Sequence, residues 1–186
     1  MKKKSRINEA GRSMIEAIGY ISVMITIGVA MAAAVNSGYY KFRLSRINQE
    51  LTDLKKVISQ RYVAAENYKE VDMETLIEEK IAPWDTRDGT HSFSGDVKIG
   101  SGDEQGNTFY IEFDDVPREA CVELGMRLWL VNDGTDLDFL KINNKTYAWK
   151  FSNSVDDSDY ELPAKAADVA EGCTEDYGND MIWYFN

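Results

Sequence analysis

The chain has 186 residues, with 21 Lys and Arg against 32 Asp and Glu, and a net charge of −11. Residues 1–61 hold 11 basic and 4 acidic side chains, a net +7, whereas residues 62–186 hold 10 and 28, a net −18. A surface this acidic excludes nucleic-acid binding by the second part, because nothing there would neutralise phosphates. All four Trp lie in residues 62–186, which indicates one packed domain rather than an acidic tail.

The segment from Ala17 to Tyr40 contains 24 consecutive residues without a charge. About 20 apolar residues in a helix cross a bilayer core, so this run predicts a transmembrane helix. Four basic residues precede it and place the N-terminus in the cytoplasm: Lys2, Lys3, Lys4 and Arg6. Lys41 and two arginines after the run reduce the difference in positive charge between its two ends.

Two simpler interpretations of the apolar run remain open. A secretory signal would use an A-x-A-like site such as Ala30-Met31-Ala32, but signal cores have roughly 7–15 apolar residues and this run is longer. A plain, uncleaved membrane anchor is the stronger alternative.

Glu16 lies one residue before the uncharged run. A carboxylate at the end of a membrane-embedded helix is costly unless it is paired. A free amine created after Gly11 on a neighbouring chain could be the partner; the alternative is a glutamate favoured by the macrodipole in the first helical turn.

The N-terminal segment has a short basic leader that ends in Gly11, then four residues, then Glu16, and then about 20 apolar residues. This arrangement resembles the class III signal of type IV pilins. The resemblance implies cleavage between Gly11 and Arg12 by a prepilin peptidase, N-methylation of Arg12, and a role of Glu16 in assembly. The chain departs from the family's pattern in two places: the residue after the cut is Arg12 instead of an apolar one, and Ala33 stands where a Pro is common.

Beyond the apolar run, five apolar residues follow a 3, 4, 3, 4 spacing: Leu44, Ile47, Leu51, Leu54 and Ile58. This stripe is typical of a helix with one buried face, and no Pro or Gly interrupts residues 39–82. We expect one helix from about Ser13 to Asn67, whose second part packs on the protein's own sheet.

The acidic part predicts mixed helices and strands. Turn residues and apolar runs place helices at Met73–Lys80, Pro117–Met126 and Pro163–Ala170, and strands at Asp96–Ile99, Thr108–Phe113, Phe139–Ile142, Lys145–Phe151 and Met181–Phe185. Asn143-Asn144 is expected to form the turn of a hairpin.

The two cysteines, Cys121 and Cys173, permit one pairing. An exported domain favours a disulfide between them; two buried free thiols are the alternative. The fragments Phe109–Cys121 and Ala166–Cys173, followed by Met181–Phe185, also resemble the disulfide-closed C-terminal region of type IVb pilins.

No enzyme is predicted. His91 is the only histidine, which excludes a multi-histidine metal site, and the chain has no P-loop and no G-x-S-x-G. Asp136 with Asp138, or Asp156 and Asp157 with Asp159, could bind calcium, but loop carboxylates are usually solvated. Asn144-Lys145-Thr146 matches a glycosylation sequon at the predicted turn. We expect no cofactor and no metal.

The fold expected is α+β: a long N-terminal helix, the pilin spine, packed on a small antiparallel sheet, with a C-terminal region bounded by the disulfide. The expected parts are a cytoplasmic leader (1–11), a long helix whose first half is transmembrane or filament core (12–66), and a globular pilin head (67–186).

The resemblance implies a structural subunit that polymerises through its N-terminal helices into a type IV pilus. Such a subunit waits in the inner membrane of a Gram-negative cell and meets a prepilin peptidase, an assembly platform and a secretin. It would then serve adhesion, aggregation, motility or conjugative mating contact. The alternatives are a minor pilin or type II secretion pseudopilin, and a membrane-anchored binding domain that never polymerises.

Overall fold

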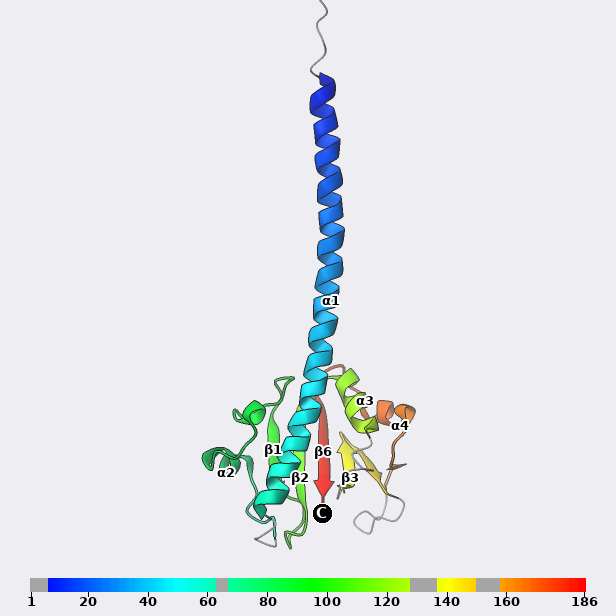
Figure 1. The fold of residues 1–186 in the computed structure, drawn as a ribbon. Coiled ribbons are helices and arrows are strands. Elements are labelled where there is room, and N and C mark those ends of the chain that lie inside the picture. Colours follow the sequence, from blue (N-terminus) through cyan, green and yellow to red (C-terminus); the bar gives the residue numbers. More distant parts are fainter. Residues whose placement is uncertain (1–6, 63–66, 128–136, 150–157) are drawn as a thin grey trace, which may run out of the picture. The chain divides into compact units, whose positions relative to one another are not determined.

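The computed structural model describes residues 7–62, 67–127, 137–149 and 158–186, with side chains from Met14 onward (Figure 1). The chain divides into two units, Met1–Phe42 and Arg43–Asn186. We call Met14–Phe42 the apolar stem and Arg43–Asn186 the globular unit. The helix α1, Ile7–Tyr62, runs through both.

The expected long helix is present. It begins at Ile7, earlier than the predicted Ser13, and its described part ends at Tyr62. Within the globular unit the predicted stripe is buried: Leu44, Ile47, Leu51, Leu54 and Ile58 are each less than a tenth exposed. Burying a side chain of this size contributes about 1.5–3 kcal/mol, so these residues fasten this part of α1 to the sheet.

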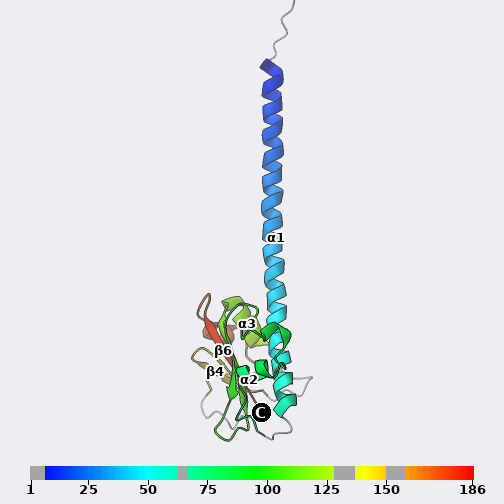
Figure 2. The same cartoon turned by 90° about the vertical axis from the view of Figure 1, so that its left-hand side faces the viewer.

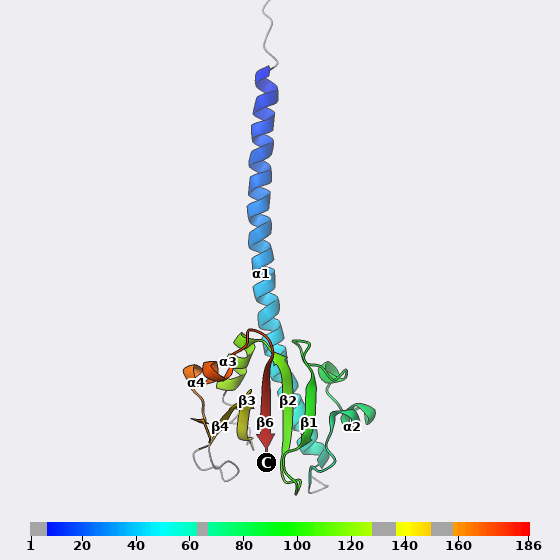
Figure 3. The ribbon, with the colours of Figure 1, turned by 180° about the vertical axis from the view of Figure 1, so that it is seen from behind.

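The globular unit contains one six-stranded sheet in the order β1-β2-β6-β3-β4-β5 (Figure 3). The strands are Val97–Ser101 (β1), Phe109–Val116 (β2), Leu137–Ile142 (β3), Lys145–Ala148 (β4), Tyr160–Glu161 (β5) and Asn179–Phe185 (β6). All neighbours are antiparallel except β4 and β5, which are parallel. The expected α+β class is confirmed, with β5 as a short strand that the sequence did not predict.

The last strand, β6, lies at the centre of the sheet between β2 and β3. Its register pairs Ile111 with Trp183 and Phe109 with Phe185, so large apolar side chains meet on one face. Alternate residues of β2 and β6 are buried, as expected for strands with one covered face. Figure 2 shows that the turns of α1 in the globular unit lie on that face.

The short helices are Met73–Glu78 (α2), Arg118–Met126 (α3) and Ala166–Gly172 (α4), with a 3₁₀ helix at Trp84–Thr86 (η1). Asp72 caps α2, since its carboxylate accepts the N–H of Thr75 at 2.7 Å. The predicted helix at Pro163–Ala170 instead begins at Ala166 and ends at Gly172. The predicted strand Lys145–Phe151 is shorter in the structure and ends at Ala148, while residues 150–157 lie outside the described residues.

Candidate functional site

The apolar stem carries a continuous apolar surface on α1. Its large side chains are between 46% and 74% exposed; they are Met14, Ile15, Ile18, Tyr20, Ile21, Val23, Met24, Ile25, Ile27, Val29, Met31, Val35, Tyr39 and Phe42. A soluble monomer rarely exposes so many apolar side chains together, so this surface indicates a membrane or a partner. Among the described residues one helix is long and apolar enough to span a bilayer, and its mean hydropathy reaches 2.1. This helix supports membrane anchoring.

Glu16 is an exposed carboxylate of the stem and directly precedes the uncharged run Ala17–Tyr40. Gly11 and Arg12 belong to α1, but their side chains lie outside the described residues. Cleavage after Gly11, methylation of Arg12 and pairing of Glu16 with a neighbouring amine all involve processing or a second chain. They stay predictions.

A polar cluster that the sequence did not predict joins α1 to the loop before β1. Glu50 of α1 is at its centre and is only 2% exposed, although it is a charged residue. Its carboxylate accepts hydrogen bonds from the N–H of Ser92, at 3.0 Å, and from the Ser92 hydroxyl. Burial raises the pKa of Glu50, and the two Ser92 bonds together with Arg46 oppose that rise.

Two arginines complete the attachment of this loop. Arg43 donates from Nε to the carbonyl of Ser92 at 2.5 Å and lies 4.6 Å from the centre of the Phe93 ring. Arg46 pairs with Asp85 on the preceding 3₁₀ helix. Because charge-assisted bonds are stronger than neutral ones, these contacts fix residues 85–93 against α1.

The lone histidine has a structural role. His91 is 3% exposed, and its Nε2–H donates to the carbonyl of Asp114 at 2.6 Å while Nδ1 accepts the N–H of Phe93 at 3.1 Å. A side chain at Gly95 would collide with both the Asp114 carbonyl and the His91 ring, so this close approach requires glycine. Burial lowers the pKa of His91.

We expect this histidine to make the protein less stable in acid. Its pKa in the folded state is below the unfolded value of about 6.5, so the unfolded state binds more protons and stability falls as the pH drops below that value. The slope for one group is at most about 1.4 kcal/mol per pH unit. The raised pKa of Glu50 acts in the opposite direction, because the folded state then takes up its proton first as the pH falls.

The measurement is urea unfolding of the wild type and of His91→Gln between pH 7 and pH 5. The variant should lose less stability than the wild type over that range, whatever its absolute stability. Equal slopes for the two proteins would show that His91 is not the group responsible.

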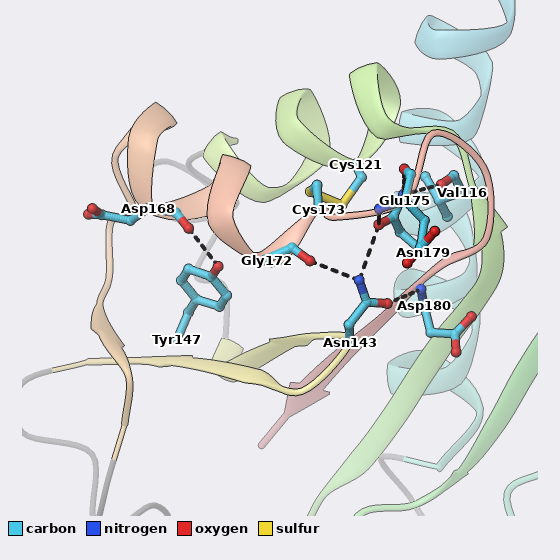
Figure 4. Close-up of a disulfide and its surroundings, with 10 residues drawn as sticks. All are labelled: Val116, Cys121, Asn143, Tyr147, Asp168, Gly172, Cys173, Glu175, Asn179 and Asp180. Atoms are coloured by element: carbon cyan, nitrogen blue, oxygen red, sulfur yellow. Dashed lines mark hydrogen bonds between the residues drawn. A yellow bond between two sulfur atoms is a disulfide. The ribbon is translucent and has the colours of Figure 1, made fainter.

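The disulfide region lies over β3 and β4, where the Tyr147 hydroxyl of β4 donates to the Asp168 carbonyl of α4 (Figure 4). The structure joins Cys121 of α3 to Cys173 at the end of α4, with a Cα–Cα distance of 6.0 Å. The two helices approach closely here, because a Cβ at Gly125 would lie 2.6 Å from a methyl group of Val169. The predicted pairing of the cysteines is present in the fold.

Asn179, which is fully buried at the start of β6, organises the backbone around the disulfide. Its Nδ2 donates to the carbonyls of Val116 at 2.9 Å and Glu175 at 2.7 Å, and its Oδ1 accepts from Asn143 at 3.1 Å. Asn143 also donates to the carbonyl of Gly172 at 2.8 Å. These bonds satisfy polar groups that burial would otherwise leave unpaired, and they fix the loop between α4 and β6.

The carboxylates that could bind calcium fall only partly within the described residues. No group of three or more potential ligands comes together in the part of the chain that is described. Asp138 is buried on β3, and Asp159 accepts the N–H of Thr146 and pairs with Lys145. Asp136, Asp156 and Asp157 lie outside the described residues. Asn144 of the sequon is exposed in the β3–β4 turn.

Residues 43–186 match a family model described as PilS N terminal. The fold is similar to the crystal structure of TcpA, a type IV pilin from the Vibrio cholerae El Tor biotype. The TM-score is 0.52 at 12% identity, over 77% of this chain and 99% of that chain. A type IV b pilin from Salmonella typhi also matches, with a TM-score of 0.48 at 19% identity, over 76% and 98% of the two chains. The comparison with curated protein sequences gave no match.

Proposed function

Because the chain belongs to the PilS family and its fold is similar to that of a type IV pilin, we propose that it is a type IVb pilin that polymerises through its N-terminal helices into an extracellular pilus. The observation that carries this proposal is the apolar stem, whose large side chains are exposed over its whole length. A bilayer covers such a surface before assembly, and the stems of other subunits cover it afterwards.

The precursor carries a cytoplasmic leader, residues 1–11, that a prepilin peptidase removes before methylating Arg12. Residues 12–66 supply the helix and residues 67–186 the head. An assembly platform lifts the subunit out of the inner membrane, and a secretin passes the fibre through the outer membrane of a Gram-negative cell. The basic leader and the position of Glu16 after Gly11 support this order of events.

In the polymer, the Glu16 carboxylate pairs with the methylated amine of Arg12 in an adjacent subunit. This pairing neutralises a carboxylate that would otherwise be buried among apolar stems. The globular units form the outer surface of the fibre, where they serve adhesion, aggregation, motility or conjugative mating contact. The strong negative charge of that surface favours protein or uncharged partners over nucleic acid.

The test is the N-terminus of the native protein, measured by mass spectrometry on filaments sheared from the cell surface. We expect a chain that starts at methylated Arg12 and is the most abundant filament protein. A low abundance would instead indicate a minor pilin or a pseudopilin. A chain that retains Met1, or one that starts near residue 35, would overturn the pilus proposal.

A further inference from the structure

We propose that the exposed aromatic side chains Trp84 and Tyr177 make a contact between successive copies of this chain, an inference that rests on the proposed polymerisation. Within the described part of the globular unit, only three large apolar side chains are exposed: Trp84 at 78%, Tyr177 at 80% and Met126 at 36%. Because Trp84 and Tyr177 are this exposed, the described part of their own chain leaves most of each side chain uncovered. Exposed Trp and Tyr are also the residues that most often anchor protein interfaces.

Trp84 borders a hollow of about 300 Å³ that also includes Arg46, Asp85, Arg87 and Asp88. The guanidinium of Arg87 lies 5.1 Å from the centre of the Trp84 ring, and Arg46 pairs with Asp85. Two cations therefore balance two carboxylates at this place. The globular unit as a whole has 15 basic and 30 acidic residues, so the hollow is far less acidic than the average surface.

Tyr177 lies on an acidic loop between α4 and β6. Glu175 and Asp176 precede it and Asp180 follows it, and residues 166–186 contain five carboxylates and no cation. The loop is held in one conformation, because Asn179 donates to the carbonyl of Glu175 at 2.7 Å and the N–H of Arg118 donates to the carbonyl of Asp176 at 3.1 Å. An ordered loop loses little conformational entropy when it binds.

The two surfaces suit each other in charge. The hollow accepts the Tyr177 ring beside Trp84, where aromatic pairing and the nearby guanidiniums stabilise it. The acidic loop would be repelled by most of the globular unit, but at the hollow it meets Arg87, which is exposed. The hollow and the loop are different surfaces of one subunit. A bound pair therefore still has one free hollow and one free loop, so that further copies can add at both ends of an open chain of subunits.

The test is a charge exchange in the full-length chain, expressed in cells whose wild-type filaments can be sheared off and quantified. Arg87→Glu and Asp176→Arg should each lower the filament yield at least about fivefold, because each places like charges in contact. The double variant should recover most of the yield. Lys56→Glu and Glu104→Arg make the same charge changes at exposed positions outside both surfaces and should leave the yield within about twofold.

A direct readout comes from a photo-crosslinking amino acid at position 84 in assembled filaments. We expect the crosslinked peptide of the neighbouring subunit to contain Tyr177. A crosslink to a different segment, or no rescue in the double variant, would overturn this contact while leaving pilus assembly intact. Absence of filaments from the wild-type chain would instead overturn the proposed function, and the contact with it.

Discussion

Removing the disulfide by Cys121→Ala with Cys173→Ala is expected to lower the free energy of unfolding by about 4 kcal/mol, because the bridge closes a loop of 52 residues in the unfolded chain. Both sulfur atoms are fully buried between α3 and α4, so the folded state also loses packing. The measurement is urea unfolding of the full-length protein in detergent, followed by Trp fluorescence.

The control separates the crosslink from the packing. Wild-type protein unfolded in the presence of a thiol reductant should lose nearly as much stability as the double variant, because reduction opens the loop but keeps the sulfur atoms. A loss below about 1 kcal/mol in both proteins would mean that the unfolded chain is already restrained in this region.

The location of the bridge explains why its loss should matter for function. It joins the two helices that flank Asn143, whose side chain donates to the Gly172 carbonyl and to Asn179. Asn179 in turn fixes the loop that carries Tyr177. The disulfide, the asparagine pair and the exposed tyrosine therefore form one connected arrangement at the start of β6.

Local patterns predicted the elements of this fold well where a periodic signal existed. The stripe from Leu44 to Ile58 is buried, and the hairpin turn at Asn143 is present, with Asn143 at a φ of 52°. In both cases neighbouring residues contain the whole signal: helical spacing in the first, and a residue that tolerates positive φ between two apolar runs in the second.

The arrangement of the strands was not predicted, because pairing between distant segments leaves little trace in a local sequence. β6 is the last strand but lies between β2 and β3. β5, which has two residues, pairs in parallel with β4 and is too short to have a recognisable pattern. The registers that place Trp183 opposite Ile111 depend on contacts between residues far apart in the chain.

The polar cluster at Glu50 was missed for a related reason. On the helix Glu50 looks like one of the charged residues that surround the apolar stripe. Its burial depends on Ser92, 42 residues later, which supplies two hydrogen-bond donors, in addition to the nearby Arg46. In the stem, by contrast, the position of Glu16 after Gly11 is a purely local pattern, and its meaning depends on processing and on a second chain.

Replacing Glu16 by alanine should leave the chain inserted and processed but reduce the filament yield at least about tenfold, because the amine of Arg12 would then have no partner among the apolar stems. Glu16→Gln keeps the size and hydrogen-bonding capacity of the side chain but removes its charge. Its filament yield should fall nearly as far as that of Glu16→Ala. Ile18→Ala, which shortens an exposed apolar side chain two residues further along the stem, is the control and should assemble normally. If Glu16 merely favoured the helix N-terminus through the macrodipole, its loss would cost no more than about 1 kcal/mol of helix stability, and assembly would continue.

Mass spectrometry of the N-terminus together with filament quantification decides between these outcomes. A normal filament yield from Glu16→Ala would exclude the pairing role, whereas loss of cleavage would place Glu16 in recognition by the peptidase instead.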